Sequence, residues 1–66
     1  MSDKTKLDST IDILARYRDV RNDLNRLMFG WRLNDPEKFE EGRVTMRVLS
    51  RRVRTFEKEI NDALSE

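Results

Sequence analysis

The chain contains no cysteine and no histidine, and it has one proline and two glycines among 66 residues. Without cysteine it forms no disulfide bonds, and without either residue it lacks the common ligands of structural zinc sites. The general base and the strong nucleophile that enzymes use most often are also missing. No glycine-rich phosphate loop or calcium-binding loop occurs. The sequence therefore predicts a protein that is not an enzyme, with no catalytic residue, cofactor, metal site or small-molecule substrate.

Long apolar runs and an excess of one charge are absent as well. The longest apolar run is 27–29, which is too short to span a bilayer, and the polar start of the chain lacks the apolar segment of a secretory signal. We therefore expect a cytoplasmic protein with no membrane contact. Although 41% of residues are charged, the net charge is only +1, which provides no overall attraction to nucleic acid.

The small size limits the core. A chain of about 60 residues buries only about 60% of its unfolded surface, and such scaffolds usually add a disulfide, a metal, an oligomeric contact or very good helix packing. Since cysteine and histidine are absent, we expect helix packing combined with oligomerisation or partner binding.

The chain does contain two periodic apolar stripes. In the second half, apolar or small residues recur in alternating steps of three and four: Phe39, Gly42, Met46, Leu49, Val53, Phe56, Ile60 and Ala63. This period predicts a helix that packs lengthwise on another helix. The first half has a similar stripe, formed by Leu7, Ile11, Leu14, Tyr17, Val20, Leu24, Leu27 or Met28, and Trp31.

Residues 33–37 separate the stripes and contain the only proline. Asn34 or Asp35 is suited to cap the second helix, and Glu37 would complete a capping box if Asn34 were the cap. We predict a frayed start at 1–6 and one domain at 7–66, with helices at about 5–32 and 35–64. Two helices joined by a short turn fold back on each other, which predicts an all-α antiparallel two-helix hairpin with Phe56 near Leu14.

Several large apolar side chains lie to the side of these stripes or beside the turn, and contiguous exposed apolar surface usually marks an interaction site. We expect the hairpin to bury them against its own copy, as a homodimeric four-helix bundle, or against a different protein. The protein would then be a non-enzymatic adaptor, co-chaperone or regulator. The alternative is a monomer with scattered surface apolar residues. The candidate interface residues are Ile13, Phe29, Trp31, Val44, Val48 and Leu64.

Trp31 and Gly42 each allow two interpretations. Trp31 either contacts a partner or closes the turn end of the hairpin as a small core. A glycine inside a helix costs about 1 kcal/mol relative to alanine. Gly42 therefore either allows close approach of Met28 or Trp31, or is simply a weak turn near the start of the helix.

An arginine stripe runs along the second helix, with no acidic residue between Gly42 and Phe56. Guanidinium groups suit phosphate, so the alternative function is an RNA- or DNA-binding hairpin dimer. The other interpretation pairs these arginines with Asp12, Asp19 and Asp23 of the first helix, and the near-neutral net charge favours it. The stripe consists of Arg43, Arg47, Arg51, Arg52 and Arg54.

In length, hairpin layout and charge content the chain resembles two classes of small helical proteins. One is the plasmid copy-control RNA-binding dimers, in which two hairpins form a four-helix bundle. The other is the two-helix co-chaperones of type III secretion needle subunits, which bind a partner chaperone through an apolar face. The resemblance implies a bacterial or phage accessory protein. No motif of either class matches residue by residue, so no functional residue is transferred.

Overall fold

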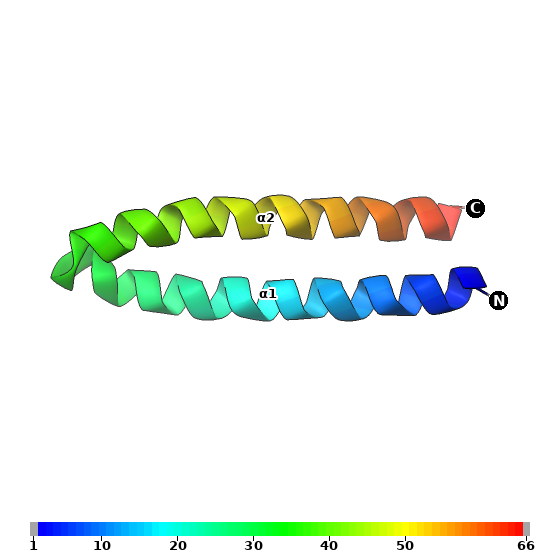
Figure 1. Cartoon of the computed structure of the whole chain (residues 1–66), viewed down its shortest axis with the longest axis horizontal. Coiled ribbons are helices and arrows are strands. Elements are labelled where there is room, and N and C mark those ends of the chain that lie inside the picture. The colour runs from blue at the N-terminus through cyan, green and yellow to red at the C-terminus, as the bar shows by residue number, and fades with distance from the viewer. Residues whose placement is uncertain (1, 66) are drawn as a thin grey trace.

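The computed structural model describes residues 2–65, and it describes the side chains of residues 5–65. Two α-helices, α1 (Ser2–Asn34) and α2 (Pro36–Ser65), run antiparallel, so that the two ends of the chain lie at the same end of the molecule (Figure 1). The predicted all-α helical hairpin is confirmed. The first helix is longer than predicted, because the segment expected to be frayed is helical from Ser2 onward; Met1 lies outside the described residues. The second helix has the predicted length and is shifted by one residue toward the C-terminus.

A single residue, Asp35, separates the two helices. Its backbone N–H donates to the carbonyl of Trp31 (2.8 Å), and its own carbonyl accepts from the N–H of Phe39 (3.0 Å). The Asp35 carboxylate accepts a hydrogen bond from the backbone N–H of Lys38 (3.3 Å), which is the geometry of a helix N-cap. Pro36 follows at the first helical position, where a missing N–H costs nothing. The cap is therefore Asp35, and the capping box with Asn34 is not formed.

The apolar stripe of α2 faces α1 as predicted. From Phe39 to Ile60 its members are buried or half-buried, and only the last, Ala63, is exposed. In α1, by contrast, Ile11 and Val20 lie outside the contact, with 45% and 52% of their surface exposed. The inner positions follow a strict seven-residue repeat instead, formed by Leu7, Thr10, Leu14, Tyr17, Arg21, Leu24, Met28 and Trp31.

The physical reason is the geometry of two helices in lengthwise contact. Only residues repeating every 3.5 positions, conventionally called a and d of a heptad a–g, stay against the partner helix. The prediction selected the most apolar residue of each turn and so left this repeat at Ile11 and Val20, whereas of the alternatives Leu27 and Met28 the repeat contains Met28. At the inner positions Thr10 and Arg21 are half-buried. The methyl group of Thr10 and the methylene groups of Arg21 can cover apolar surface, and the Thr10 hydroxyl donates a hydrogen bond to the Lys6 carbonyl of its own helix (2.9 Å).

Two contacts define the register of the helices. The rings of Tyr17 and Phe56 pack with their centroids 5.5 Å apart, and Arg18 forms an ion pair with Glu57. Phe56 therefore lies about one helical turn further along α1 than predicted, since Leu14 was its expected neighbour. The difference arises because α1 continues to Asn34 and the chain reverses at Asp35.

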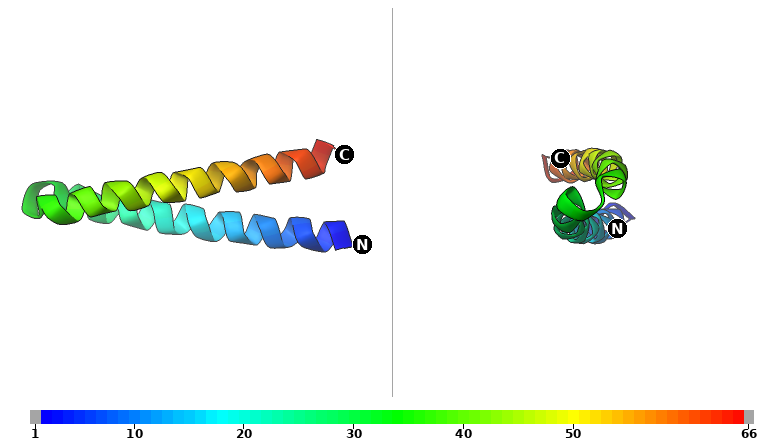
Figure 2. Two further views of the ribbon diagram at one scale, coloured as in Figure 1. Left: turned by 45° about the horizontal axis from the view of Figure 1, so that its top comes forward. Right: turned by 90° about the vertical axis from the view of Figure 1, so that its left-hand side faces the viewer.

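The hairpin is long and thin, measuring 50 × 14 × 13 Å, and it exposes 5738 Å². A compact protein of 7.9 kDa would expose about 4,400 Å². The helices diverge toward the termini (Figure 2). The apolar side chains that are buried among the described residues are Leu14, Met28, Leu49 and Val53. Neither helix, over its described length, has a stretch apolar enough to cross a membrane.

Candidate interaction surfaces

Exposed apolar side chains outnumber buried ones on this hairpin. Five of the six predicted interface residues are exposed, from Ile13 at 38% to Phe29 at 79%. Such a surplus exceeds the single exposed residues that any soluble protein carries. The large apolar side chains that are exposed are Ile11, Ile13, Val20, Leu27, Phe29, Leu33, Val44, Val48 and Leu64.

The predicted interface residues do not share one face. Val44 and Val48 occupy outer positions of α2, turned away from α1, whereas Ile13 is beside the inner positions of α1. Phe29 and Leu64 belong to the opposite side of the hairpin from Ile13, Phe29 near the turn and Leu64 near the end of α2. A single partner surface would therefore contact only some of these residues.

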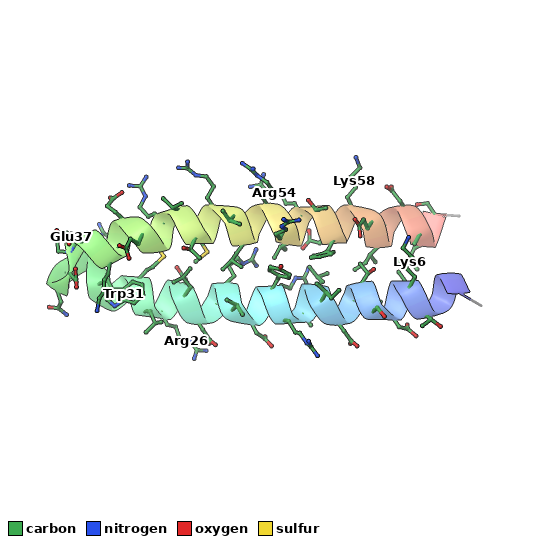
Figure 3. The ribbon with its side chains drawn as sticks, viewed as in Figure 1. Lys6, Arg26, Trp31, Glu37, Arg54 and Lys58 are labelled. Carbon is green, nitrogen blue, oxygen red and sulfur yellow. The ribbon has the colours of Figure 1, made fainter. Side chains whose placement is uncertain are left out.

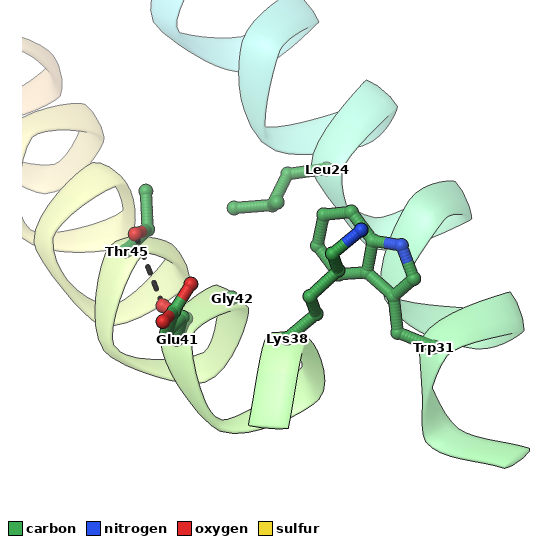
Figure 4. A pocket seen from close by; sticks show the side chains of 6 residues that line it. All are labelled: Leu24, Trp31, Lys38, Glu41, Gly42 and Thr45. Carbon is green, nitrogen blue, oxygen red and sulfur yellow. Dashed lines mark hydrogen bonds between the residues drawn. The ribbon is translucent and has the colours of Figure 1, made fainter. Parts of the chain in front are cut away.

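Trp31 belongs to the hairpin itself. It is half-buried, and a Cβ atom added to Gly42 would lie 3.3 Å from its Cζ3 atom and 2.8 Å from the Cγ atom of Met28. Gly42 thus gives room to the side chains of Met28 and Trp31, and the interpretation of Trp31 as a small core at the turn fits this contact better than an interface role does. Beside it is a shallow hollow of about 290 Å³ (Figure 4), lined by Leu24, Trp31, Lys38, Glu41, Gly42 and Thr45.

The arginine stripe is exposed along its whole length. Arg47, Arg51 and Arg54 occupy outer positions of α2, with Lys58 continuing the series, and Figure 3 shows Arg54 and Lys58 extending away from α1. Two members of the stripe differ from these three: Arg43 forms an ion pair with Glu40 (3.2 Å), and Arg52 lies on the flank of α2.

The predicted pairing of these arginines with the aspartates of α1 is not made within the chain. Among the side chains of residues 5–65, the ion pair that joins the helices is Arg18–Glu57 (2.6 Å). Asp12 and Asp19 occupy outer positions of α1, on the far side of the hairpin from Arg47, Arg51 and Arg54. The two sets of charges therefore face solvent in opposite directions.

One feature was missed by the sequence analysis. Ile13, Val20 and Leu27 recur every seven residues along the flank of α1, and all three are exposed. Val20 and Leu27 had been assigned to the inner stripe, which left Ile13 as an isolated residue. Their seven-residue spacing was the signal that connects them, because residues seven apart lie on the same side of a helix.

Comparison of the chain with models of protein families, with curated proteins and with solved structures gives no match. No group of acidic side chains within the described part of the chain is arranged to hold a metal ion. The functional argument therefore rests on the surfaces of the hairpin.

Proposed function

We propose that the protein is a non-enzymatic interaction module, an adaptor, co-chaperone or regulator, that acts by burying exposed apolar side chains of the hairpin against another protein chain. The observation that carries this proposal is the imbalance, among the side chains of residues 5–65, between nine large exposed apolar side chains and four buried ones. The exposed surface exceeds that of a compact chain by roughly 1,300 Å². A standard protein interface buries about 800 Å² on each partner, so the excess is large enough for one.

A cytoplasmic location belongs to the same proposal. The partner is either a second copy of the chain or a different protein. Either would supply the layer that a two-helix hairpin lacks, because each helix packs on only one neighbour while its apolar residues extend over more than one side.

The experiment is site-specific photo-crosslinking in cells, with a photoreactive phenylalanine analogue at Phe29, Val44 or Val48, one position at a time. A matched control carries the analogue at Arg26, an exposed polar position on the outer side of α1 (Figure 3). We expect an adduct of one defined mass from at least one apolar position and none from Arg26. The proposal is contradicted if all positions give no adduct and the purified chain stays a monomer.

A second candidate function is phosphate binding by α2, as in an RNA- or DNA-binding protein. It is favoured by the outward orientation of Arg47, Arg51 and Arg54, which have no carboxylate partner among the described side chains. Val44 and Val48 interleave with these arginines, and aromatic side chains suited to base stacking do not. This pattern fits backbone contact better than base recognition.

The measurement is binding to duplex RNA and DNA over a salt series. If α2 binds phosphate, affinity falls steeply with salt, and each arginine replaced by glutamine flattens the slope by about one unit. Glutamine at Arg26 of α1 is the control and should leave the slope unchanged. Undetectable binding at low salt excludes this function.

A further inference from the structure

The flank of α1 carries a continuous stripe of exposed residues at alternating steps of four and three. At 100° per residue these positions fall on one side of the helix, roughly 100° around its axis from the positions that face α2. We call this set the side stripe. Its members are Ser9, Ile13, Arg16, Val20, Asp23, Leu27 and Gly30.

The side stripe is self-complementary: if a second copy runs antiparallel with its Val20 beside Val20 of the first, matching residues lie opposite each other. Ile13 and Leu27 lie seven residues to either side of Val20, and both are large aliphatic residues. Arg16 and Asp23 lie four and three residues away, with opposite charges. At the two ends Ser9 and Gly30 are both small. In an antiparallel copy of the same helix, large side chains would therefore lie opposite large ones, small opposite small, and each charge opposite a charge of the other sign.

The residues of the side stripe are available for contact with another chain. Among the described side chains, neither Arg16 nor Asp23 has an ion pair, although other charged residues lie nearby on α1. A Cβ atom added to Gly30 would meet nothing within 4 Å. Val20 and Leu27 each expose more than half of their surface.

We propose that the hairpin forms a symmetric dimer with a second copy through the side stripe, with α1 antiparallel to α1 of the partner and a two-fold axis beside Val20. Val20 contacts the same residue of the other copy, Ile13 packs on its Leu27, and Arg16 pairs with its Asp23. Each unlike contact occurs twice. This inference rests on the proposed function and adds the identity of the partner and the contact surface.

Symmetry favours this arrangement over the other exposed apolar patches. A two-fold contact uses one self-complementary patch on both copies and closes, whereas unlike patches produce open chains of molecules. The neighbouring flank of α2 is not self-complementary. There Arg52 lies about level with residues 21–23 of α1, as the Tyr17–Phe56 and Arg18–Glu57 contacts show, and in a two-fold contact centred on it two like charges would face each other. The contact is therefore centred on α1.

The experiment is sedimentation equilibrium of the full chain over a concentration series, with helicity followed by circular dichroism. It compares the wild type with Arg16→Asp, with Asp23→Arg and with the double exchange. Asp19→Arg is the matched control, because it makes the same charge change at an exposed outer position of α1.

We expect a wild-type dimer whose dissociation constant rises at least tenfold in each single variant, since like charges then face each other twice. The double exchange should return the dissociation constant to within about threefold of the wild-type value. The control variant should also stay within about threefold of that value. A monomeric wild type overturns the proposed dimer. The proposed function as an interaction module would then still be tested by the crosslinking experiment. A dimer that neither single exchange weakens, or that the double exchange does not restore, also overturns it.

A second measurement does not depend on charge. Because the chain has no cysteine, Val20→Cys introduces a single thiol at the proposed axis. Under oxidised glutathione it should form a disulfide-linked dimer at least tenfold faster than Val44→Cys, an exposed valine on α2. Equal rates for the two variants overturn the proposal.

Discussion

The two glycines of this chain show how one residue type serves opposite environments. Both lie within helices, where glycine is less favourable than alanine by about 1 kcal/mol. Gly42 is buried against the side chains of Met28 and Trp31, whereas the side of α1 at Gly30 is open. The same substitution should therefore have opposite effects at the two positions.

We expect Gly42→Ala to lower the free energy of unfolding by about 1 kcal/mol. The new Cβ would lie 2.8 Å from the Met28 Cγ atom, which is the middle of that side chain, so the helices must separate or Met28 must change rotamer. This cost outweighs the gain in helix propensity. Gly30→Ala, the control, should raise the free energy of unfolding by up to 1 kcal/mol. Urea unfolding at one protein concentration measures both, and a stabilising Gly42→Ala would contradict the close approach.

At the scale of the helices, Asp35 performs two tasks at once. Its backbone extends the hydrogen bonding of α1 through the bond to the Trp31 carbonyl, while its side chain caps α2. Pro36 then begins α2 with a backbone angle that already suits a helix. Because Asp35 alone connects the two helices, the reversal of the chain depends strongly on this residue.

Asp35→Ala should destabilise the hairpin by about 0.5–2 kcal/mol, because the first turn of α2 loses its acceptor. Asn34→Ala changes the neighbouring polar residue, whose side chain is exposed at the end of α1, and should alter stability by less than 0.5 kcal/mol. Thermal unfolding followed by circular dichroism compares the two variants. Equal effects would show that the carboxylate cap contributes nothing measurable.

The arginine stripe shows that the position of a charge around the helix decides which partner it can reach. Arg47, Arg51 and Arg54 were expected to pair with α1, yet they occupy outer positions of α2. Opposite charges on two helices pair only when both lie on the flanks beside the contact, as Arg18 and Glu57 do. Sequence proximity in an antiparallel register is therefore insufficient without the heptad position.

The whole molecule has a thin core relative to its surface. Two helices packed on each other bury only four apolar side chains among the described residues, Leu14, Met28, Leu49 and Val53. Chains of this size are marginal without an additional source of stability. Association through the side stripe would be such a source, and its contribution would grow with protein concentration.

We therefore expect the wild-type melting temperature to rise by about 3–6 °C for each tenfold increase in protein concentration. The Asp23→Arg variant should melt at a lower temperature than the wild type at each concentration, because its association is weakened. Scanning calorimetry or circular dichroism at several concentrations measures both. A wild-type melting temperature that stays constant would mean that the monomer alone accounts for the stability.

Much of the fold was predictable because helix signals are local. The seven-residue repeat in residues 39–60, the proline after Asp35 and the absence of other helix breakers determine two helices and the turn between them. Which apolar residues of α1 face inward was predicted less well. Ile11 and Val20 are as apolar as Leu14, so composition alone favours all three.

The sequence by itself determined that the chain is a pair of helices with a short reversal, because periodicity, capping and breaking act within a few residues. The contact of the two helices decided the rest. It selected the heptad positions that face the partner helix, placed the half-buried Thr10 and Arg21 among them, and left Ile13, Val20 and Leu27 exposed as one row on the flank of α1. The physical reason is that a straight helix can bury only one side against a single neighbour, and that side follows from packing geometry as well as from hydrophobicity.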